Sequence, residues 1–277
     1  MCDIVFRSKL SEMHSDFKDK VVVVTGATAG IGLAAARMFK DGGAKVVCVA
    51  RRHSEEFFSV QADVSDCEQV RAAVEQILST FGRIDVLVNN AGCGISGAVE
   101  DTTEKDARAL FNVDFFGALF MIQQCVPAMR SGGGGTIINV SSVAAELAIP
   151  FQAFYSAAKA AILSLSKALR NEVAPFNIKV TAVLPGDVRT DFTSARKKNA
   201  ADSAAYGDRV ARSVAVMEGD ERHGMPPELI ARTIVKLAAR KNPPVSVAGG
   251  AKYKLFLLLN RLLPQRLVSF IIGKMYG

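Results

Sequence analysis

The sequence is poor in the side chains that build metal clusters and disulfide frameworks. It has three His and five Cys in 277 residues. The cysteines are scattered, with no Cys-x-x-Cys pair and no histidine at metal-ligand spacing: Cys2, Cys48, Cys67, Cys93 and Cys125. Because the cysteines are odd in number and scattered along the chain, they exclude a fold held together by disulfides and indicate reduced thiols in a cytoplasmic protein. We predict no metal site.

A continuous hydrophobic run is missing from the first twenty residues. They alternate charged with apolar side chains, so we expect no secretory signal and interpret residues 1–19 as an N-terminal extension. The chain also has no internal repeat, no low-complexity tract and no linker long enough to separate domains. Residues 20–250 are therefore expected to fold as one dinucleotide-binding and catalytic domain.

Acidic side chains are scarce in the last third of the chain. From Asp187 onward there are 16 Lys/Arg against 8 Asp/Glu, whereas residues 1–186 carry 18 against 19. The whole net charge of +7 therefore lies near the C-terminus. This distribution argues against a nucleic-acid-binding fold built around a basic face, and no nucleic-acid partner is predicted.

Strand-like and helix-like segments alternate along the chain. Short β-branched runs are predicted as strands, and the small-residue or amphipathic segments between them as helices. Ser65 and Glu68 are spaced as a capping box for the second helix. The expected strands are 21–24, 45–50, 59–62, 84–88, 136–140, 178–184 and 245–248, and the expected helices are 30–41, 65–81, 103–130, 152–173 and 228–240. We predict an α/β fold with a single doubly wound, Rossmann-type parallel sheet, helices on both faces and a C-terminal helical extension.

A glycine-rich loop stands between the first predicted strand and the first predicted helix. Gly26, Gly30 and Gly32 have the spacing Gly-x-x-x-Gly-x-Gly, and Thr28 and Ile31 lie between them. Glycines let the backbone turn sharply and approach a pyrophosphate, while the helix N-terminus offers free N–H groups. A tight structural turn is the alternative, but the strand-to-helix junction favours dinucleotide binding. No Lys follows the last glycine, which disfavours a nucleoside-triphosphate loop.

Two arginines follow the second predicted strand. An acidic residue at this place would hold the free 2′-hydroxyl of NAD, but the chain has Arg51 and Arg52. A guanidinium grips a phosphate through paired N–H donors. The pair therefore favours NADP(H) over NAD(H), with two solvated surface arginines as the alternative.

Tyr155 and Lys159 are four residues apart on a predicted helix, so their side chains emerge on one face. A phenol with an ordinary pKa near 10 is a poor proton donor or acceptor at neutral pH. A neighbouring ammonium favours the phenolate and lowers that pKa. Taken alone, the Tyr-x-x-x-Lys spacing would occur by chance in many proteins.

Other polar and glycine-containing motifs fall at the ends of predicted strands. Asn-Asn-Ala-Gly at 89–92 ends the fourth strand, Ser-Ser at 141–142 the fifth and Pro-Gly at 185–186 the sixth. These are the strand ends where ligands bind in an open α/β sheet. With these motifs in order over residues 20–248, the chain resembles the short-chain dehydrogenase/reductase family, of the shorter type.

The resemblance implies a role for each matching residue. Tyr155 would be the general acid/base, Lys159 would lower its pKa and hold the nicotinamide ribose, and Ser142, rather than Ser141, would hydrogen-bond the substrate oxygen. Asn112 would position a water that relays protons to Lys159. The remaining implied cofactor contacts are Asp63 and Val64 at the adenine, Asn90, Ala91 and Gly92 in the cleft, Pro185, Gly186 and Val188 after the sixth strand, and Thr190 at the nicotinamide amide.

The C-terminal third carries two segments of open interpretation. Residues 187–225 are irregular and charged, which suits a substrate lid, with a plain surface loop as the alternative. Residues 251–277 are basic and amphipathic, and Pro264 helps to break the apolar runs, so a membrane-spanning helix is excluded there. This tail is predicted either to contact a membrane surface peripherally or to pack on the body, cap the cleft or join subunits.

The sequence thus predicts an NADP(H)-dependent enzyme that interconverts a ketone and a secondary alcohol. A lipophilic substrate such as a steroid, retinoid or acyl-chain carbonyl fits the apolar tail. The alternatives are a non-catalytic NADP(H) sensor on the same fold and a 3-oxoacyl-type reductase. A sensor need not keep Tyr155, Lys159, Ser142 and Asn112 together. The resemblance also implies a homodimer or homotetramer, in the cytoplasm or peripheral to a membrane.

Overall fold

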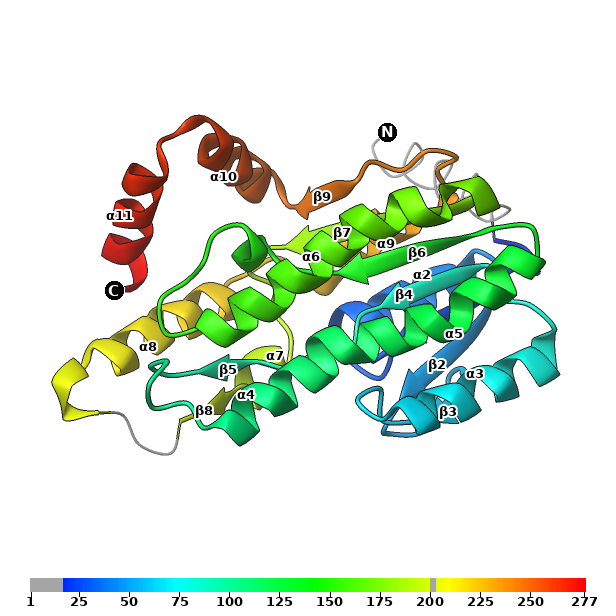
Figure 1. The fold of residues 1–277 in the computed structure, drawn as a ribbon, viewed down its shortest axis with the longest axis horizontal. Helices are drawn as coiled ribbons and strands as arrows, with labels where there is room; N and C mark the ends of the chain where they lie inside the picture. The colour runs from blue at the N-terminus through cyan, green and yellow to red at the C-terminus, as the bar shows by residue number, and fades with distance from the viewer. Residues whose placement is uncertain (1–16, 200–202) are drawn as a thin grey trace, which may run out of the picture.

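The computed structural model describes residues 17–199 and 203–277 and is built around a seven-stranded sheet (Figure 1). The strand order is β3-β2-β1-β4-β6-β7-β9, and every neighbouring pair is parallel. The strands are β1 (Val21–Thr25), β2 (Lys45–Ala50), β3 (Phe58–Gln61), β4 (Val86–Asn89), β6 (Gly135–Val140), β7 (Ile178–Pro185) and β9 (Ser246–Gly249). The predicted doubly wound parallel sheet is confirmed.

Helices cover both faces of this sheet. The buried clusters place α2 (Gly30–Asp41) and α9 (Pro227–Ala239) on one face. The other face is covered by α3 (Cys67–Phe81), α5 (Ala118–Ser131) and α6 (Ala153–Val173). Short turns of 3-10 helix, η2 (Val143–Ala145) and η3 (Ala174–Phe176), flank α6.

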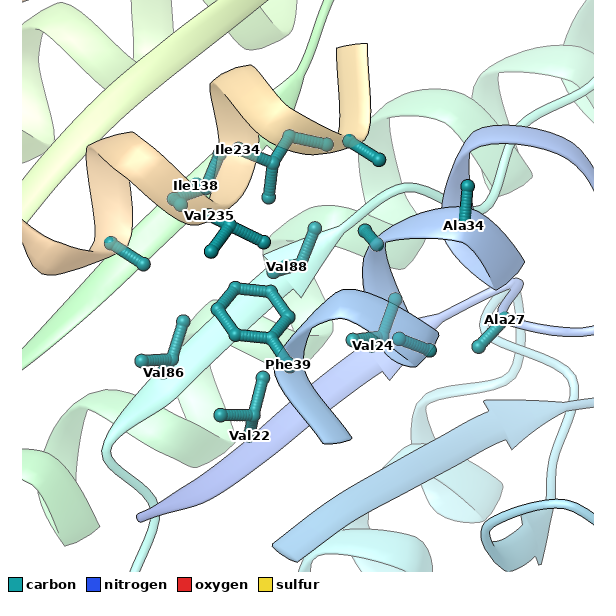
Figure 2. Packing of buried hydrophobic residues seen from close by; sticks show 14 of the residues in the cluster. Val22, Val24, Ala27, Ala34, Phe39, Val86, Val88, Ile138, Ile234 and Val235 are labelled. Atoms are coloured by element: carbon teal, nitrogen blue, oxygen red, sulfur yellow. The ribbon is translucent and has the colours of Figure 1, made fainter. Parts of the chain in front are cut away.

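Alternate residues of β1 build the two halves of the core. Val22 and Val24 pack with α2 and α9, whereas Val21 and Val23 pack with the opposite layer. All four are at most 1% exposed. Figure 2 shows the first half, where Phe39 of α2 and Val235 of α9 lie beside the valines of β1 and β4. A run of valines therefore forms a strand buried on both faces, as parallel sheets require.

The strand order reverses beside β1, which has β2 on one side and β4 on the other. The crossovers on the two sides of this point leave in opposite directions, so a crevice opens at the carboxyl ends of β1 and β4. The glycine-rich loop follows β1 and Asn90 follows β4. The topology thus brings two of the predicted cofactor motifs to one place.

The long helix predicted over 103–130 is interrupted by a wider turn. It consists of α4 (Glu104–Phe111), the π-helical segment η1 (Asn112–Gly117) and α5. A Cβ on Gly117 would lie 2.8 Å from Cγ2 of Val64, so glycine permits the close approach of this segment to its neighbour. The π turn holds one more residue than an α turn and so changes which side chains face the sheet.

Among the described residues, this helix (Glu104–Ser131) is the one long and apolar enough, by length and composition alone, to cross a membrane. Its apolar residues also have a role in the core. Met121, Cys125 and Met129 are completely buried against the sheet. Packing in the fold therefore accounts for the apolar face.

One local expectation is wrong. Asp66, and not Ser65, caps α3, because its carboxylate accepts hydrogen bonds from the backbone N–H groups of Glu68 and Gln69. Ser65 instead donates to Asp63. Within the extension predicted for 1–19, Phe17 is 1% exposed and packs edge-on against Phe39. Residues 1–16, including His14, lie outside the described part.

The segment predicted to be irregular, 187–225, is largely ordered into short elements. It contains α7 (Phe192–Ala195), β8 (Lys197–Lys198), η4 (Ala204–Tyr206) and the longer helix α8 (Arg209–Arg222). β8 pairs in parallel with β5 (Ile95–Ser96) to form a separate two-stranded sheet. Polar residues on α8 reduced the apolar signal that would have predicted it, yet Val210, Val214 and Met217 form its buried stripe.

The C-terminal tail forms two helices, α10 (Ala251–Leu262) and α11 (Gln265–Tyr276), separated at Pro264. In Figure 1 they stand at one end of the molecule, beyond the carboxyl edge of the sheet. α10 leaves β9 directly, and α11 packs against α8. The predicted helical extension is confirmed, and it contacts the body.

Phe17 tests where the folded domain begins. Replacing this buried ring in Phe17→Ala leaves a cavity beside Phe39, and we expect the free energy of unfolding to fall by about 3 kcal/mol. Urea unfolding followed by circular dichroism measures it. Phe176→Ala, at a ring that is 40% exposed, is the matched control and should cost far less. Equal, small losses in the two variants would mean that Phe17 is no part of the core.

Candidate active site

A cleft of about 900 Å³ lies at the carboxyl ends of the central strands. Its size is in the range of small-molecule and cofactor sites. The predicted site residues that line it are Gly26, Thr28, Gly30, Ile31, Arg51, Arg52, Asp63, Val64, Asn90, Ala91, Gly92, Ser142, Tyr155, Lys159, Pro185, Gly186, Val188 and Thr190. Gly32 lies just behind the lining, and Asn112 is not at the cleft.

The glycine-rich loop has the backbone geometry that its sequence predicts. Gly26 and Gly30 have φ values of +66° and +54°, in the left-handed region that favours glycine. α2 begins directly after this loop, with no side chain capping it and no acidic residue in its first turn. Its first N–H groups are therefore free of protein side-chain acceptors and suit an anionic group.

Asn90 ties the end of β4 to this loop. Its side-chain amide donates to the carbonyl oxygens of Thr25 at 3.0 Å and Gly26 at 3.3 Å. A Cβ on Gly32 would lie 2.4 Å from that amide nitrogen and 2.5 Å from the Gly26 carbonyl oxygen. Gly32 therefore acts behind the cleft, by letting the loop and Asn90 pack together.

The two arginines after β2 stand at the open end of the cleft. Both are exposed, and Arg52 donates a hydrogen bond of 3.1 Å to the hydroxyl of Thr28. Asp63 and Val64 line the same end. Two left-handed glycines, a free helix N-terminus and two guanidiniums form a donor-rich cradle, so the residues present fit an anionic dinucleotide.

A buried ion pair lies at the inner end of the cleft. Lys159 Nζ is 2.9 Å from Asp114 Oδ2, and the two side chains are 6% and 0% exposed. Burial alone would lower the pKa of Lys159, but the adjoining carboxylate raises it above its ordinary value. Asp114 is held in turn by the backbone N–H of Cys93, at 2.7 Å. Lys159 therefore stays charged in the interior.

Tyr155 lies beside this pair, with Lys159 Nζ 5.5 Å from the centre of its ring. Burial raises the pKa of the phenol more than Lys159 lowers it, and the negative charge of Asp114 raises it further. A hydrogen bond with Ser142 acts in the opposite direction. The expectation that Lys159 lowers this pKa holds for its own contribution, but in this protein environment the net direction is upward.

The two serines after β6 have different partners. Ser141 donates its hydroxyl proton to the Lys159 carbonyl oxygen at 2.7 Å, which fixes it to α6. Ser142 accepts from the backbone N–H of Ala144 at 3.1 Å and interacts with Tyr155. The geometry therefore leaves the Ser142 hydroxyl as the one that can turn its proton toward a substrate oxygen.

Asn112 does not occupy the place that the resemblance assigned to it. It is exposed at the start of the π-helical segment, whereas Asp114, two residues later, faces Lys159. The sequence held one signal for this, since Asp114 lies within an apolar run and a buried carboxylate requires a partner. Next to Lys159 the structure therefore has the carboxylate of Asp114, and not the side chain of Asn112, which was expected to position a water that relays protons to the lysine.

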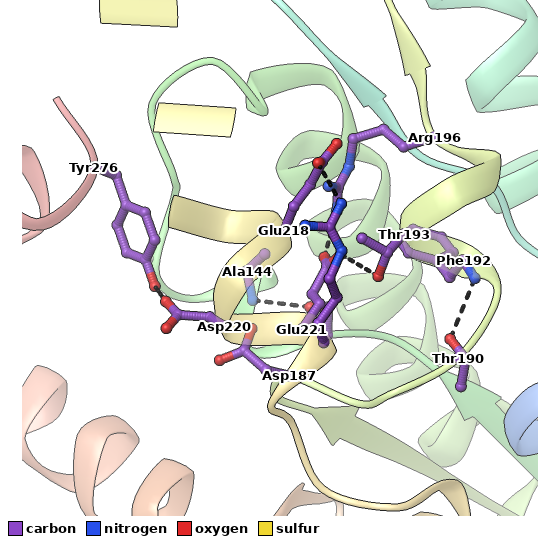
Figure 3. A network of polar contacts seen from close by, with 12 residues as sticks. Ala144, Asp187, Thr190, Phe192, Thr193, Arg196, Glu218, Asp220, Glu221 and Tyr276 are labelled. Carbon is purple, nitrogen blue, oxygen red and sulfur yellow. Dashed lines mark hydrogen bonds and ion pairs between the residues drawn. The ribbon is translucent and has the colours of Figure 1, made fainter. Parts of the chain in front are cut away.

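The far wall of the cleft comes from the segment after β7 (Figure 3). Glu221 of α8 accepts a hydrogen bond of 2.7 Å from Thr193 and forms an ion pair with Arg196. The ring of Phe192 lies 5.6 Å from that of Tyr155. Tyr276 of α11 also lines the cleft. None of these residues was predicted from the sequence.

The chain belongs to the short-chain dehydrogenase/reductase family. The family model described as "short chain dehydrogenase" matches residues 20–201. The chain is 39% identical over 264 residues to a 3-ketodihydrosphingosine reductase of Bacteroides thetaiotaomicron, covering 93% of this chain and 98% of the relative. It is 31% identical over 278 residues to dehydrogenase/reductase SDR family member 7B of Xenopus tropicalis, covering 93% and 86%. The chain is an oxidoreductase of this family.

Solved structures agree with the fold. A short-chain dehydrogenase of Streptomyces avermitilis superposes with a TM-score of 0.78 at 33% identity, covering 86% of this chain and 92% of that chain. A short-chain dehydrogenase of Burkholderia cenocepacia, in complex with NADP, superposes with a TM-score of 0.73 at 28% identity, covering 91% of this chain and 97% of that chain. A 3-ketoacyl-(acyl-carrier-protein) reductase of Brucella melitensis, complexed with NADH, superposes with a TM-score of 0.71 at 29% identity, covering 83% of this chain and 96% of that chain. The fold thus binds a nicotinamide cofactor.

Asp114 offers a test of the charges around Tyr155. In Asp114→Asn the negative charge that raises the pKa of Tyr155 is removed, while the positive charge of Lys159 stays beside the phenol, so the pKa of Tyr155 should fall. Alcohol oxidation requires the phenolate as base, so the acidic limb of its pH–rate profile should move to lower pH. Steady-state rates with a secondary alcohol and oxidised cofactor measure this.

Asp106→Asn is the matched control for Asp114→Asn, because Asp106 lies near the same cleft but pairs with the exposed Lys197. Its profile should stay in place. An unchanged or upward-shifted limb in Asp114→Asn would contradict the assigned electrostatics.

Proposed function

We propose that this enzyme is an NADPH-dependent reductase that converts a lipophilic ketone to a secondary alcohol. The observation that carries the proposal is the placement of Tyr155, Lys159 and Ser142 at the inner end of a cleft whose open end is the phosphate cradle. A cofactor laid along that cleft has its anionic half and its reactive half at the two ends. Bound NADPH would supply the hydride.

Each protein group then has a role in proton transfer or positioning. Ser142 and Tyr155 donate hydrogen bonds to the carbonyl oxygen as negative charge develops on it, and Tyr155 transfers its proton to that oxygen. Lys159 keeps a positive charge beside the phenol, which stabilises the phenolate that results. Asp114 holds Lys159 in position.

Two observations support reduction as the favoured direction. Burial and Asp114 raise the pKa of Tyr155, so the phenol keeps its proton at neutral pH and is ready to act as an acid. The relative from Bacteroides thetaiotaomicron is named a reductase of a 3-keto compound. Oxidation would require the phenolate and is therefore favoured only at higher pH.

The lipophilic substrate class rests on the walls of the cleft. Its inner part is lined by apolar side chains that include Ile95, Ile149, Phe192 and Met217. The name of the Bacteroides relative refers to a ketone derived from dihydrosphingosine. We therefore propose a long-chain or polycyclic ketone, of which a keto-sphingoid base, a steroid, a retinoid and an acyl-chain carbonyl are the compounds to compare.

The NADP(H) preference rests on Arg51 and Arg52 at the cradle's open end. The hydrogen bond from Arg52 to Thr28 holds one guanidinium next to the glycine-rich loop. No acidic side chain follows β2 until Glu55. A 2′-phosphate would be well matched there, whereas a free 2′-hydroxyl would lack its usual carboxylate acceptor.

For the assembly, we propose a cytoplasmic homodimer or homotetramer. The support is the family's association through its long helices, together with one exposed ring on such a helix. Phe116, in the π-helical segment, is 39% exposed. Residues 187–225 carry the far wall of the cleft, and we propose that they determine substrate choice.

Tyr155 tests the proposed reaction. In Tyr155→Phe the proton donor is lost while the ring remains, so ketone reduction should fall by about 10²- to 10⁴-fold. NADPH oxidation, monitored against a panel of steroid, retinoid, acyl and keto-sphingoid ketones, measures it, and fluorescence titration should show retained NADPH binding. Tyr206→Phe, outside the cleft lining, should behave as the unmodified enzyme. A near-normal rate in Tyr155→Phe would overturn the assignment.

The arginines test the cofactor preference. In the double variant Arg51→Ala, Arg52→Ala, the dissociation constant for NADPH should rise at least about tenfold, because charge-assisted hydrogen bonds to the 2′-phosphate are lost. The constant for NADH should change little. Titration of cofactor fluorescence gives both constants, with Arg71→Ala on α3 as the control. Equal changes for the two cofactors would remove the basis for NADP selection.

A further inference from the structure

The tail helices hold most of the exposed large apolar side chains of the described chain. Of fifteen such residues, eight lie in α10 and α11. We call these eight the tail surface: Leu255, Leu258, Leu259, Leu262, Leu267, Phe270, Ile271 and Met275. Leu262 is 72% exposed and Phe270 is 63% exposed. A concentration of this kind marks an interaction site.

The spacing of these residues gives each helix one continuous apolar stripe. In α10 they stand at positions i, i+3, i+4 and i+7, from Leu255 to Leu262. In α11 they stand at i, i+3, i+4 and i+8, from Leu267 to Met275. Such spacing places the side chains on one side of each helix. The tail surface therefore consists of one apolar stripe on each helix rather than of scattered side chains.

A second set of residues on the same helices holds them to the body, so the exposed stripes are not left over from loose packing. Tyr253 lies against Gly186, where a Cβ would come within 2.2 Å of its ring, and it hydrogen-bonds Asp187. Leu257 and Val268 are buried. Tyr276 donates to Asp220 of α8 at 3.3 Å. With these anchors satisfied, the outer stripes face away from the protein.

The charge beside the stripes is of one sign. The tail carries five basic side chains and no Asp or Glu: Lys252, Lys254, Arg261, Arg266 and Lys274. All five are exposed. Apolar stripes flanked by exposed cations match the boundary of an anionic lipid bilayer, where the apolar side chains enter the acyl region and the cations meet the headgroups.

We propose that α10 and α11 form a docking surface for an anionic membrane. A second copy of the chain fits the tail less well, because a two-fold interface places the same patch on both sides and would bring these cations together. Tyr276 lines the cleft from the inner side of α11. If the proposed function holds, docking brings the cleft next to the bilayer that dissolves a lipophilic ketone.

Vesicle co-sedimentation tests the docking without using enzyme activity. The full chain is mixed with vesicles of phosphatidylcholine, with or without phosphatidylglycerol. We expect binding that requires phosphatidylglycerol and weakens as salt is raised. The double variant Leu262→Gln, Phe270→Gln should bind about tenfold less or weaker still, because two apolar side chains no longer enter the lipid. Lys254→Gln, Arg266→Gln should lose a similar factor through charge.

The matched control is Val99→Gln, Phe176→Gln, which changes two exposed apolar residues outside the tail. It should bind vesicles as the unmodified chain does, and circular dichroism melts should show that every variant is folded. Binding that ignores phosphatidylglycerol, or that survives both tail variants, would overturn the proposal. Absence of vesicle binding by the full chain would also overturn it. If the tail variants then changed an oligomer to monomers in sedimentation velocity, the tail surface would be a subunit interface instead.

Discussion

A buried ammonium and a buried carboxylate fix the geometry on which the rest of the site depends. Lys159 and Asp114 are each almost fully withdrawn from solvent, and each charge offsets part of the desolvation cost of the other. Because Lys159 is on α6 and Asp114 on the π-helical turn before α5, the pair joins the two long helices at the edge of the sheet. Tyr155, one turn before Lys159, lies beside this pair, and both charges act on its pKa.

The fold supplies the surroundings of this pair from segments far apart in the sequence. Reversal of the strand order beside β1 opens the crevice, and Asn90 ties the end of β4 to the glycine-rich loop. Gly32 permits that contact because it has no side chain. The C-terminal tail also contributes to the cleft. Tyr276 lines it, and Tyr253 accepts a hydrogen bond from the backbone N–H of Asp187, another lining residue. The phosphate cradle, the proton donor Tyr155 and the wall of the cleft that follows β7 are thus all positioned by buried contacts within one fold.

The sheet and the cofactor end of the site could be predicted because their signals are local. Valine runs form strands, glycines mark the turn after β1, and Tyr155 and Lys159 share a helix face at fixed spacing. What could not be predicted depends on contacts across the fold. The π turn that exposes Asn112 and buries Asp114 follows from packing against neighbouring elements. α8 was missed because its outward face is strongly polar, and Phe17 because a single ring carries no periodicity.

The central claim concerns the phenol of Tyr155, whose pKa is raised by burial and by Asp114 more than Lys159 lowers it. The most direct measurement is carbon-13 NMR of the labelled tyrosine ζ-carbons in the cofactor-free protein, titrated with pH, with Tyr155→Phe used to assign the resonance. The account predicts that Tyr155 stays protonated above the ordinary tyrosine value of about 10. A resonance that titrates below that value would contradict it.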